Sequence, residues 1–243
     1  MGIFLDVSII ILFIVFIVSG FKKGLIKSLV GFVGTIIAIF LSAYLSRIVS
    51  LFIYDNFVRD TLLVNINDIL NEYVEHDLNE KALAVFNGLP NILSNALTFC
   101  GITSNVVGNV IESSAGNASY ALVELFYPTI ISIIKTILMP FIFLIVIIPI
   151  NLLTKVVGKV SRFPVLRQID QIIGAIIAAL KCFVLILLIT FLLRMFLPMM
   201  GSIPNIFSKN TIESTFLFKN FYDNNMIYNF FVNRMKSDIH FSL

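Results

Sequence analysis

Residues 3–45 read IFLDVSIIILFIVFIVSGFKKGLIKSLVGFVGTIIAIFLSAYL, and this stretch decides the fold. Two apolar runs flank the short turn GFKKG at residues 20–24. Each run is close in length to the stretch of about 20 helical residues that crosses a ~30 Å hydrocarbon core. We therefore expect one membrane span from Ile3 to Phe21 and a second from Leu25 or Ser28 to Leu45, joined as a hairpin.

The tip of this hairpin is basic. It carries Lys22 and Lys23, with Lys27 just beyond, and it contains no acidic residue. Short loops rich in lysine and arginine stay in the cytoplasm. A cleavable signal peptide would place its basic residues before the apolar run, whereas these lysines follow it. The tip is predicted inside and the N-terminus outside.

The composition of the whole chain agrees with a membrane protein. Of its 243 residues, 58% are hydrophobic and 13% are charged, and the mean hydropathy is +0.99. A soluble domain averages about 25% charged residues. We predict an all-α integral membrane bundle of about four transmembrane helices. The net charge is only +3, and the basic residues do not alternate with aromatic residues as they would on a nucleic-acid-binding surface. Both features argue against nucleic acid as a partner.

The sequence divides the rest of the chain into three parts. Residues 46–128 carry three basic and nine acidic side chains, which is typical of an outer-face insertion. Apolar residues at helical spacing from Leu62 to Val74 predict an amphipathic helix that ends before Gly88, and shorter helices should cover Asn91–Phe99 and Val106–Ile111.

Residues 129–200 should hold the third and fourth spans. The third falls between Thr129 and Leu153 and is kinked by its two internal prolines. The loop at residues 154–171 has four basic residues and one acidic residue, so it is predicted inside. The last apolar stretch runs from Ile172 to Met200, and residues 201–243 form an outer-face tail, which also places the C-terminus outside.

Small residues form a stripe along the second span at steps of three and four. They are Gly24, Ser28, Gly31, Thr35, Ala38 and Ser42. Such a stripe lets another helix approach closely where lipid supplies no hydrophobic effect between helices. Packing is the main interpretation, with a pore-lining or self-association face as the alternative. Gly174 and Ala178 of the last span form a matching stripe.

Lys181 is the odd residue of the last span. It lies about 16 Å along a helix that starts at Asp170, at about 1.5 Å per residue, and an unpaired charge at that depth is costly. Either Lys181 has a partner or a water-filled niche, or residues 170–180 are shallow or re-entrant and the span begins near Cys182. We favour the second interpretation.

Other charges suggest structural roles. Asp6 and Arg194 both fall near the outer ends of their spans, and a direct pair between them would clamp the first helix to the last. Asp170 should cap the N-terminus of its own helix after a turn at Pro164.

The sequence contains no catalytic motif and no glycine-rich nucleotide motif, so we predict that the chain is not an enzyme and uses no cofactor. Glu72, His76 and Glu80 share a helical face at a spacing of four residues, and two such ligands can hold a metal. A solvated amphipathic surface is the preferred interpretation, and no metal site is predicted.

The order of these features resembles the CvpA family, the bacterial colicin V production proteins. The residues that carry the resemblance are Asp6, the turn Gly20–Gly24, Gly31 and Gly34, then Pro164, Asp170, Gly174 and the step from Ala178 to Cys182. The chain departs from the family pattern at Ala178 and Cys182, where glycine is usual, and at Lys181, where arginine is common.

The resemblance implies a multi-pass protein of the bacterial inner membrane that supports colicin V production or export and envelope homeostasis, including tolerance of bile-type detergents. The expected partners are the lipid bilayer and either a further copy or another membrane protein, with no small-molecule substrate identified. The alternative is a small channel or transporter with a path near Lys181. The candidate residues are Asp6, Gly20, Lys23, Gly24, Ser28, Gly31, Pro164, Asp170, Gly174, Lys181 and Arg194.

Overall fold

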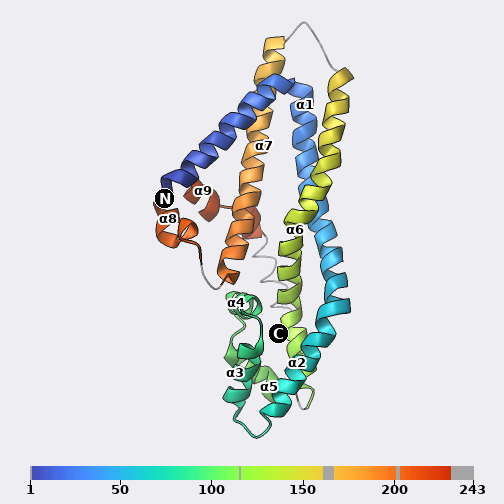
Figure 1. The fold of residues 1–243 in the computed structure, drawn as a ribbon, viewed down its shortest axis with the longest axis vertical. Coiled ribbons are helices and arrows are strands. Elements are labelled where there is room, and N and C mark those ends of the chain that lie inside the picture. The colour runs from blue at the N-terminus through green and yellow to red at the C-terminus, as the bar shows by residue number, and fades with distance from the viewer. Residues whose placement is uncertain (1, 115, 161–166, 201–202, 231–243) are drawn as a thin grey trace. The chain divides into compact units, whose positions relative to one another are not determined.

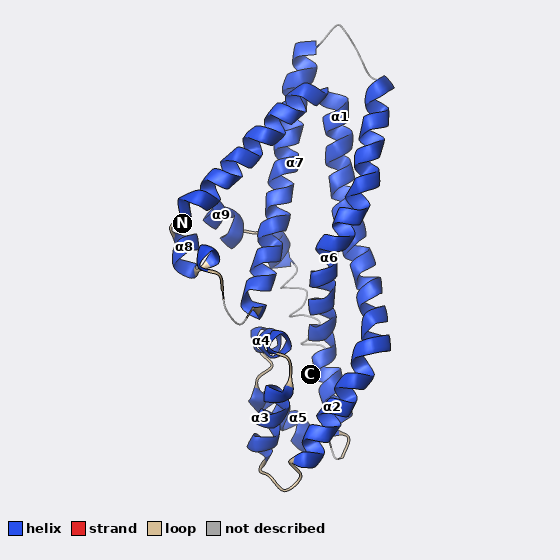
Figure 2. Ribbon diagram, viewed as in Figure 1, coloured by secondary structure: helices blue, strands red, loops and turns tan. Residues whose placement is uncertain are grey.

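The computed structural model describes residues 2–114, 116–160, 167–200 and 203–230, and within these ranges it contains helices and no strand (Figures 1 and 2). The all-α prediction is confirmed. In chain order the elements are α1 Gly2–Ile53, the π-helix η1 Tyr54–Val58, α2 Arg59–Glu72, α3 Leu78–Gly88, α4 Asn91–Phe99, α5 Ser104–Ser113, α6 Ala118–Val160, α7 Arg167–Phe196, the 3-10 helices η3 Leu197–Met199 and η4 Asn205–Phe207, α8 Lys209–Glu213 and α9 Leu217–Asp223.

Three helical stretches of the described chain are long and apolar enough to cross a membrane: Gly2–Glu72, Ala118–Leu153 and Gln168–Met199. The first contains both arms of the predicted hairpin, because α1 has non-helical backbone at Gly24 with φ 76° and ψ 180°. Figure 1 shows the resulting sharp turn within α1. The four predicted apolar segments therefore lie in three long helices.

Large apolar side chains are exposed along all three of these helices. Phe40 on α1, Ile145 on α6 and Ile176 on α7 are examples, with 72%, 67% and 56% of their surface exposed. Water would make such exposure unfavourable, whereas lipid tails solvate these side chains well. Their distribution agrees with helices that face a bilayer.

The last span is one uninterrupted helix. α7 has 30 residues and passes through residue 182 without a break, which gives a length of about 45 Å at about 1.5 Å per residue. A re-entrant segment needs a chain reversal, and α7 contains none. The interpretation that we favoured from the sequence, a shallow or re-entrant segment at residues 170–180, is therefore wrong in its re-entrant form, and a shallow position of these residues stays a prediction.

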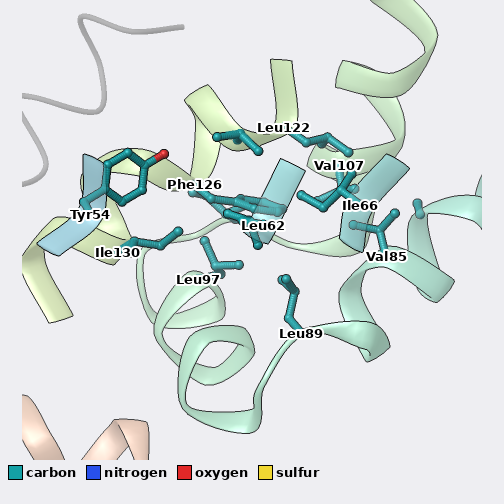
Figure 3. Packing of buried hydrophobic residues seen from close by; sticks show 13 residues of the cluster. Tyr54, Leu62, Ile66, Val85, Leu89, Leu97, Val107, Leu122, Phe126 and Ile130 are labelled. Atoms are coloured by element: carbon teal, nitrogen blue, oxygen red, sulfur yellow. The ribbon is translucent and has the colours of Figure 1, made fainter. Parts of the chain in front are cut away.

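The chain forms two compact units. The first comprises residues 1–45, 139–194 and 204–230, and the second comprises 46–138 and 195–203 of the described chain. In the second unit the acidic insertion is helical, as predicted, and its core is apolar (Figure 3). Leu62 and Ile66 of α2, Val85 of α3 and Leu97 of α4 pack there with Phe126 of α6.

The insertion differs from its prediction at one break. The amphipathic helix expected to continue as far as Gly88 is two helices, because α2 ends at Glu72 and α3 begins at Leu78. Tyr73 leaves helical geometry with ψ 22°, and the N–H of His76 donates to its carbonyl oxygen at 3.0 Å. Glu72, His76 and Glu80 consequently do not share a helical face.

The core of the second unit gives a direct test of its packing. Leu97 is fully buried, whereas Leu83 on α3 is 49% exposed. Leu97→Ala should lower the free energy of unfolding by about 2–5 kcal/mol, since it leaves a cavity. Leu83→Ala should change it by about 0.5 kcal/mol or less. Amide hydrogen exchange across α3–α5 measures both, and equal effects would contradict this core.

Candidate functional site

The hairpin tip and α7 touch through their backbones in the first unit. A Cβ added to Gly174 would lie 2.5 Å from the carbonyl carbon of Gly24 and 2.7 Å from the carbonyl oxygen of Gly20. A Cβ added to Gly20 would lie 2.4 Å from the Cβ of Ala178. Glycine is needed on both sides, because any side chain would separate the two backbones.

Gly24 also makes the turn itself possible. Its φ of 76° lies in the left-handed region that glycine adopts without strain. The helix restarts at once, and the backbone N–H of Leu25 donates to Asp170 Oδ1 at 2.9 Å. Asp170 therefore caps the second arm of α1, whose N-terminal partial positive charge favours a carboxylate.

This contact revises the role predicted for Asp170. The residue lies in the first turn of α7, which begins at Arg167, but its carboxylate binds the N-terminus of another helical segment. Pro164, which was expected to form the preceding turn, lies outside the described residues.

The small-residue stripe of the second arm is buried. Thr35, Ala38 and Ser42 have no exposed surface, and Ser28 retains 5%. The Thr35 hydroxyl donates to the Gly31 carbonyl oxygen at 2.8 Å, which satisfies it within its own helix. A Cβ on Gly34 would lie 2.2 Å from Ile150 Cγ2 of α6, so this arm also packs closely on α6.

Lys181 lines a cavity of about 200 Å³. Lys23 and Lys27 line the same cavity, together with Ser19, Ser28 and Asn151. The structure therefore places Lys181 beside a cavity that other polar side chains also line, and its depth in the membrane stays a prediction. The cavity brings together three lysines from two helices and two of the predicted small residues, Ser28 and Gly31.

Asp6 and Arg194 do not form the direct pair expected from the sequence. Asp6 Oδ2 accepts a hydrogen bond from the N–H of Phe216 at 2.8 Å, and Oδ1 accepts from the N–H groups of Leu217 and Phe218 at 3.0 and 2.9 Å. Three backbone donors at the start of α9 thus share one carboxylate.

Arg194 binds the opposite end of the same helix. Its guanidinium donates to the carbonyl oxygens of Tyr222 and Asp223, both at 2.8 Å. Its Cζ also lies over the Tyr228 ring, 3.9 Å from the ring centroid. Burial raises the pKa of the Tyr222 phenol, and the charge of Arg194 opposes that rise. An acid at the N-terminus of α9 and a base at its C-terminus complement the helix dipole. The two residues clamp α9, each at one end.

Asn225 is a structural residue that sequence reasoning missed. It has no exposed surface, and its amide donates at 2.8 Å both to the Leu187 carbonyl oxygen and to Thr190 Oγ1 of α7. Its partners lie more than 30 positions away in sequence, and no local pattern marks it. Within the described residues no group of three His, Cys, Asp or Glu side chains is arranged to hold a metal ion.

Comparison with known proteins identifies the family. The family model described as "Colicin V production protein" matches residues 98–226, more than half of the chain. The chain belongs to this family. The matched region contains α7, the cap residue Asp170, Arg194 and α9, whereas Asp6 and the hairpin tip lie before it. No curated protein and no solved structure matches the chain.

The glycine contact of this colicin V production family protein can be tested by adding one methyl group. Gly174→Ala should lower the free energy of unfolding by about 1–3 kcal/mol, because its Cβ meets backbone that cannot yield. Gly108 is a matched control, since a Cβ there would meet Ala82 Cβ at an ordinary 3.6 Å. Gly108→Ala should be neutral or stabilise by up to about 1 kcal/mol. Thermal unfolding of the purified proteins in one detergent compares them, and equal melting temperatures would contradict the contact.

The clamp on α9 can be distinguished from a direct pair by exchanging its charges. In the double variant Asp6→Arg, Arg194→Asp, a direct pair would be restored, whereas both ends of α9 would face the wrong charge. We expect the double variant to be at least as impaired as either single one. Asp6→Asn should cost about 0.5–2 kcal/mol, as for other lost caps, and Glu213→Gln, at an exposed side chain, should cost little.

Hydrogen exchange at the amides of residues 216–218 is the readout for this exchange of charges. Faster exchange in Asp6→Asn and in the double variant is the expected result. A double variant that recovers the protection of the wild type would show that the clamp is wrong.

Proposed function

We propose that this family member is a non-enzymatic protein of the bacterial inner membrane that supports colicin V production or export and envelope homeostasis. Membership of the colicin V production family is the observation that carries the proposal. Its membrane character is supported by the three long apolar helices of the described chain.

The proposed orientation places the hairpin tip inside and both termini outside. The tip lysines and the start of α7 lie together, because Gly24 contacts Asp170 and Gly174. The last residues of the predicted basic loop, from Arg167 on, form the start of α7 and so lie at the same end of the first unit as the basic tip. Two basic connections at one end support a cytoplasmic location for that end.

The charged residues of the helices support a structural mode of action. Asp6, Asp170 and Arg194 are each occupied with backbone groups at helix ends. The family member would then work as an assembly, with its own copies or with another membrane protein. Since the small-residue stripe is buried within the chain, a partner would contact the exposed apolar faces of the long helices instead.

A channel or transporter with a path near Lys181 is the second candidate. The observation that favours it is the cavity with its three lysines. Against a through-path, α7 continues beyond Lys181 into an apolar cluster of Cys182, Ile186, Leu5 and Ile9.

The proposed function is tested in a toxin-producing bacterial strain that lacks its own family member. Loss should reduce colicin V export and tolerance of a bile detergent, and the wild-type protein should restore both. Gly108→Ala should restore them equally, and Gly174→Ala should not, because it separates the tip from α7. Unchanged export and tolerance on deletion would contradict the proposal.

Two further measurements, one in the native membranes of this strain and one with purified protein, test the mode of action. Crosslinking in native membranes should give species larger than the monomer, and a purely monomeric result would contradict assembly. Solute flux through liposomes that contain the purified protein would favour the second candidate instead.

A further inference from the structure

The cavity beside Lys181 has the chemistry of an anion site. Lys23 and Lys27 of α1 and Lys181 of α7 line it, and none of the residues that line the cavity is acidic. Within the described chain none of these three groups forms an ion pair. Asp170, the acid near the tip, directs its Oδ1 at the N–H of Leu25.

Like charges gathered around one small volume repel each other, and low-dielectric surroundings strengthen that repulsion. Lys181 and Lys27 are partly buried, whereas Lys23 is exposed. An arrangement of this kind is costly while the cavity holds water alone. A bound anion would convert the repulsion into attraction.

Ser28 is the second, independent observation. Its side chain retains only 5% exposure, and its Oγ has no hydrogen-bond partner in the described structure. A buried polar group without a partner costs about 1–3 kcal/mol. Other buried hydroxyls of these helices avoid the cost by donating to a carbonyl four residues earlier, as Thr35 does to Gly31 and Thr190 does to Ile186.

Ser28 lies in the first turn of the restarted arm of α1. The residue four positions earlier is Gly24, whose φ is 76°, and the Ser28 hydroxyl does not donate to its carbonyl. Ser28 is one of the residues that line the cavity, as are Lys27 and Gly31, and its buried hydroxyl lacks a partner there.

We propose that this cavity binds a phosphate group, held by Lys23, Lys27 and Lys181 and by a hydrogen bond from the Ser28 hydroxyl. Its volume of about 200 Å³ far exceeds the about 10–15 Å³ that one water needs. Lysine ammonium groups are common phosphate ligands, and basic pockets between membrane helices bind lipid head groups. The phosphate can belong to an anionic phospholipid or be the free ion.

The charge of the lining residues does not distinguish an anionic phospholipid from the free ion, because both carry a phosphate group. Val15 and Phe16 also line the cavity and would suit the glycerol and first methylenes of a lipid. The binding measurement must therefore include both sources. It does not depend on the role in toxin production, so either proposal can fail alone.

The test uses native mass spectrometry of the purified full chain in detergent. Phosphatidylglycerol, phosphatidylcholine and inorganic phosphate are added separately, and phosphatidylglycerol is also titrated against inorganic phosphate. We expect phosphatidylglycerol to bind at least tenfold more tightly than zwitterionic phosphatidylcholine. Binding of inorganic phosphate alone would also support the site and would assign it to the free ion. Binding of neither phosphatidylglycerol nor inorganic phosphate would overturn the proposal.

Variants separate this site from general attraction to a basic surface. Lys181→Gln and Lys27→Gln should each weaken binding about tenfold, the typical effect of losing one hydrogen bond to a charged group. Lys22→Gln is the matched control, because Lys22 is exposed on the same tip and does not line the cavity. It removes the same charge and should leave binding unchanged.

Ser28→Ala keeps all the lysines and tests the hydroxyl. It should weaken phosphate binding severalfold while leaving the melting temperature of the unliganded protein equal or higher, because an unpaired buried hydroxyl is removed. The proposal would be overturned if Lys22→Gln weakened phosphate binding as much as Lys181→Gln. It would also be overturned if neither Ser28→Ala nor Lys181→Gln changed phosphate binding.

Discussion

The backbone of the hairpin tip lies directly against the backbone of α7, and this contact organises the first unit. Gly20 and Gly24 on one side meet Gly174 on the other at a distance that no Cβ could occupy. Close approach of this kind is how helices associate in lipid, where packing must replace the hydrophobic effect. The tip lysines, the Asp170 cap and the position of Lys181 all follow from it.

Helix ends pose the second constraint, because backbone groups without partners are costly near hydrocarbon. The restarted arm of α1 receives its cap from Asp170 of α7, and α9 receives one from Asp6 of α1 and another from Arg194 of α7. In each case the capping charge comes from a distant part of the sequence. The same few charges therefore satisfy local helix ends and hold separate segments together.

The sequence predicted the parts of the fold that depend on local pattern. Apolar runs, the tip turn, the buried stripe from Gly24 to Ser42 and the helices of the insertion could all be read from composition and spacing. The break at residues 73–77 was missed because apolar periodicity continues on both sides of it. Partners over a hundred residues apart, such as Leu25 and Asp170, leave no local signal, and so Asp6 and Arg194 were wrongly paired.

One glycine connects the fold to the candidate site. At Gly24 the chain reverses, which brings Lys23 and Lys27 to the side of Lys181. Ser28, four residues after this reversal, is buried and its hydroxyl has no partner. Unpaired charge and an unpaired hydroxyl are both destabilising, and native structures tolerate such local conflicts chiefly where a site requires them. The turn that makes close packing possible also places these residues along one cavity, which is why structure and the proposed binding are linked at this position.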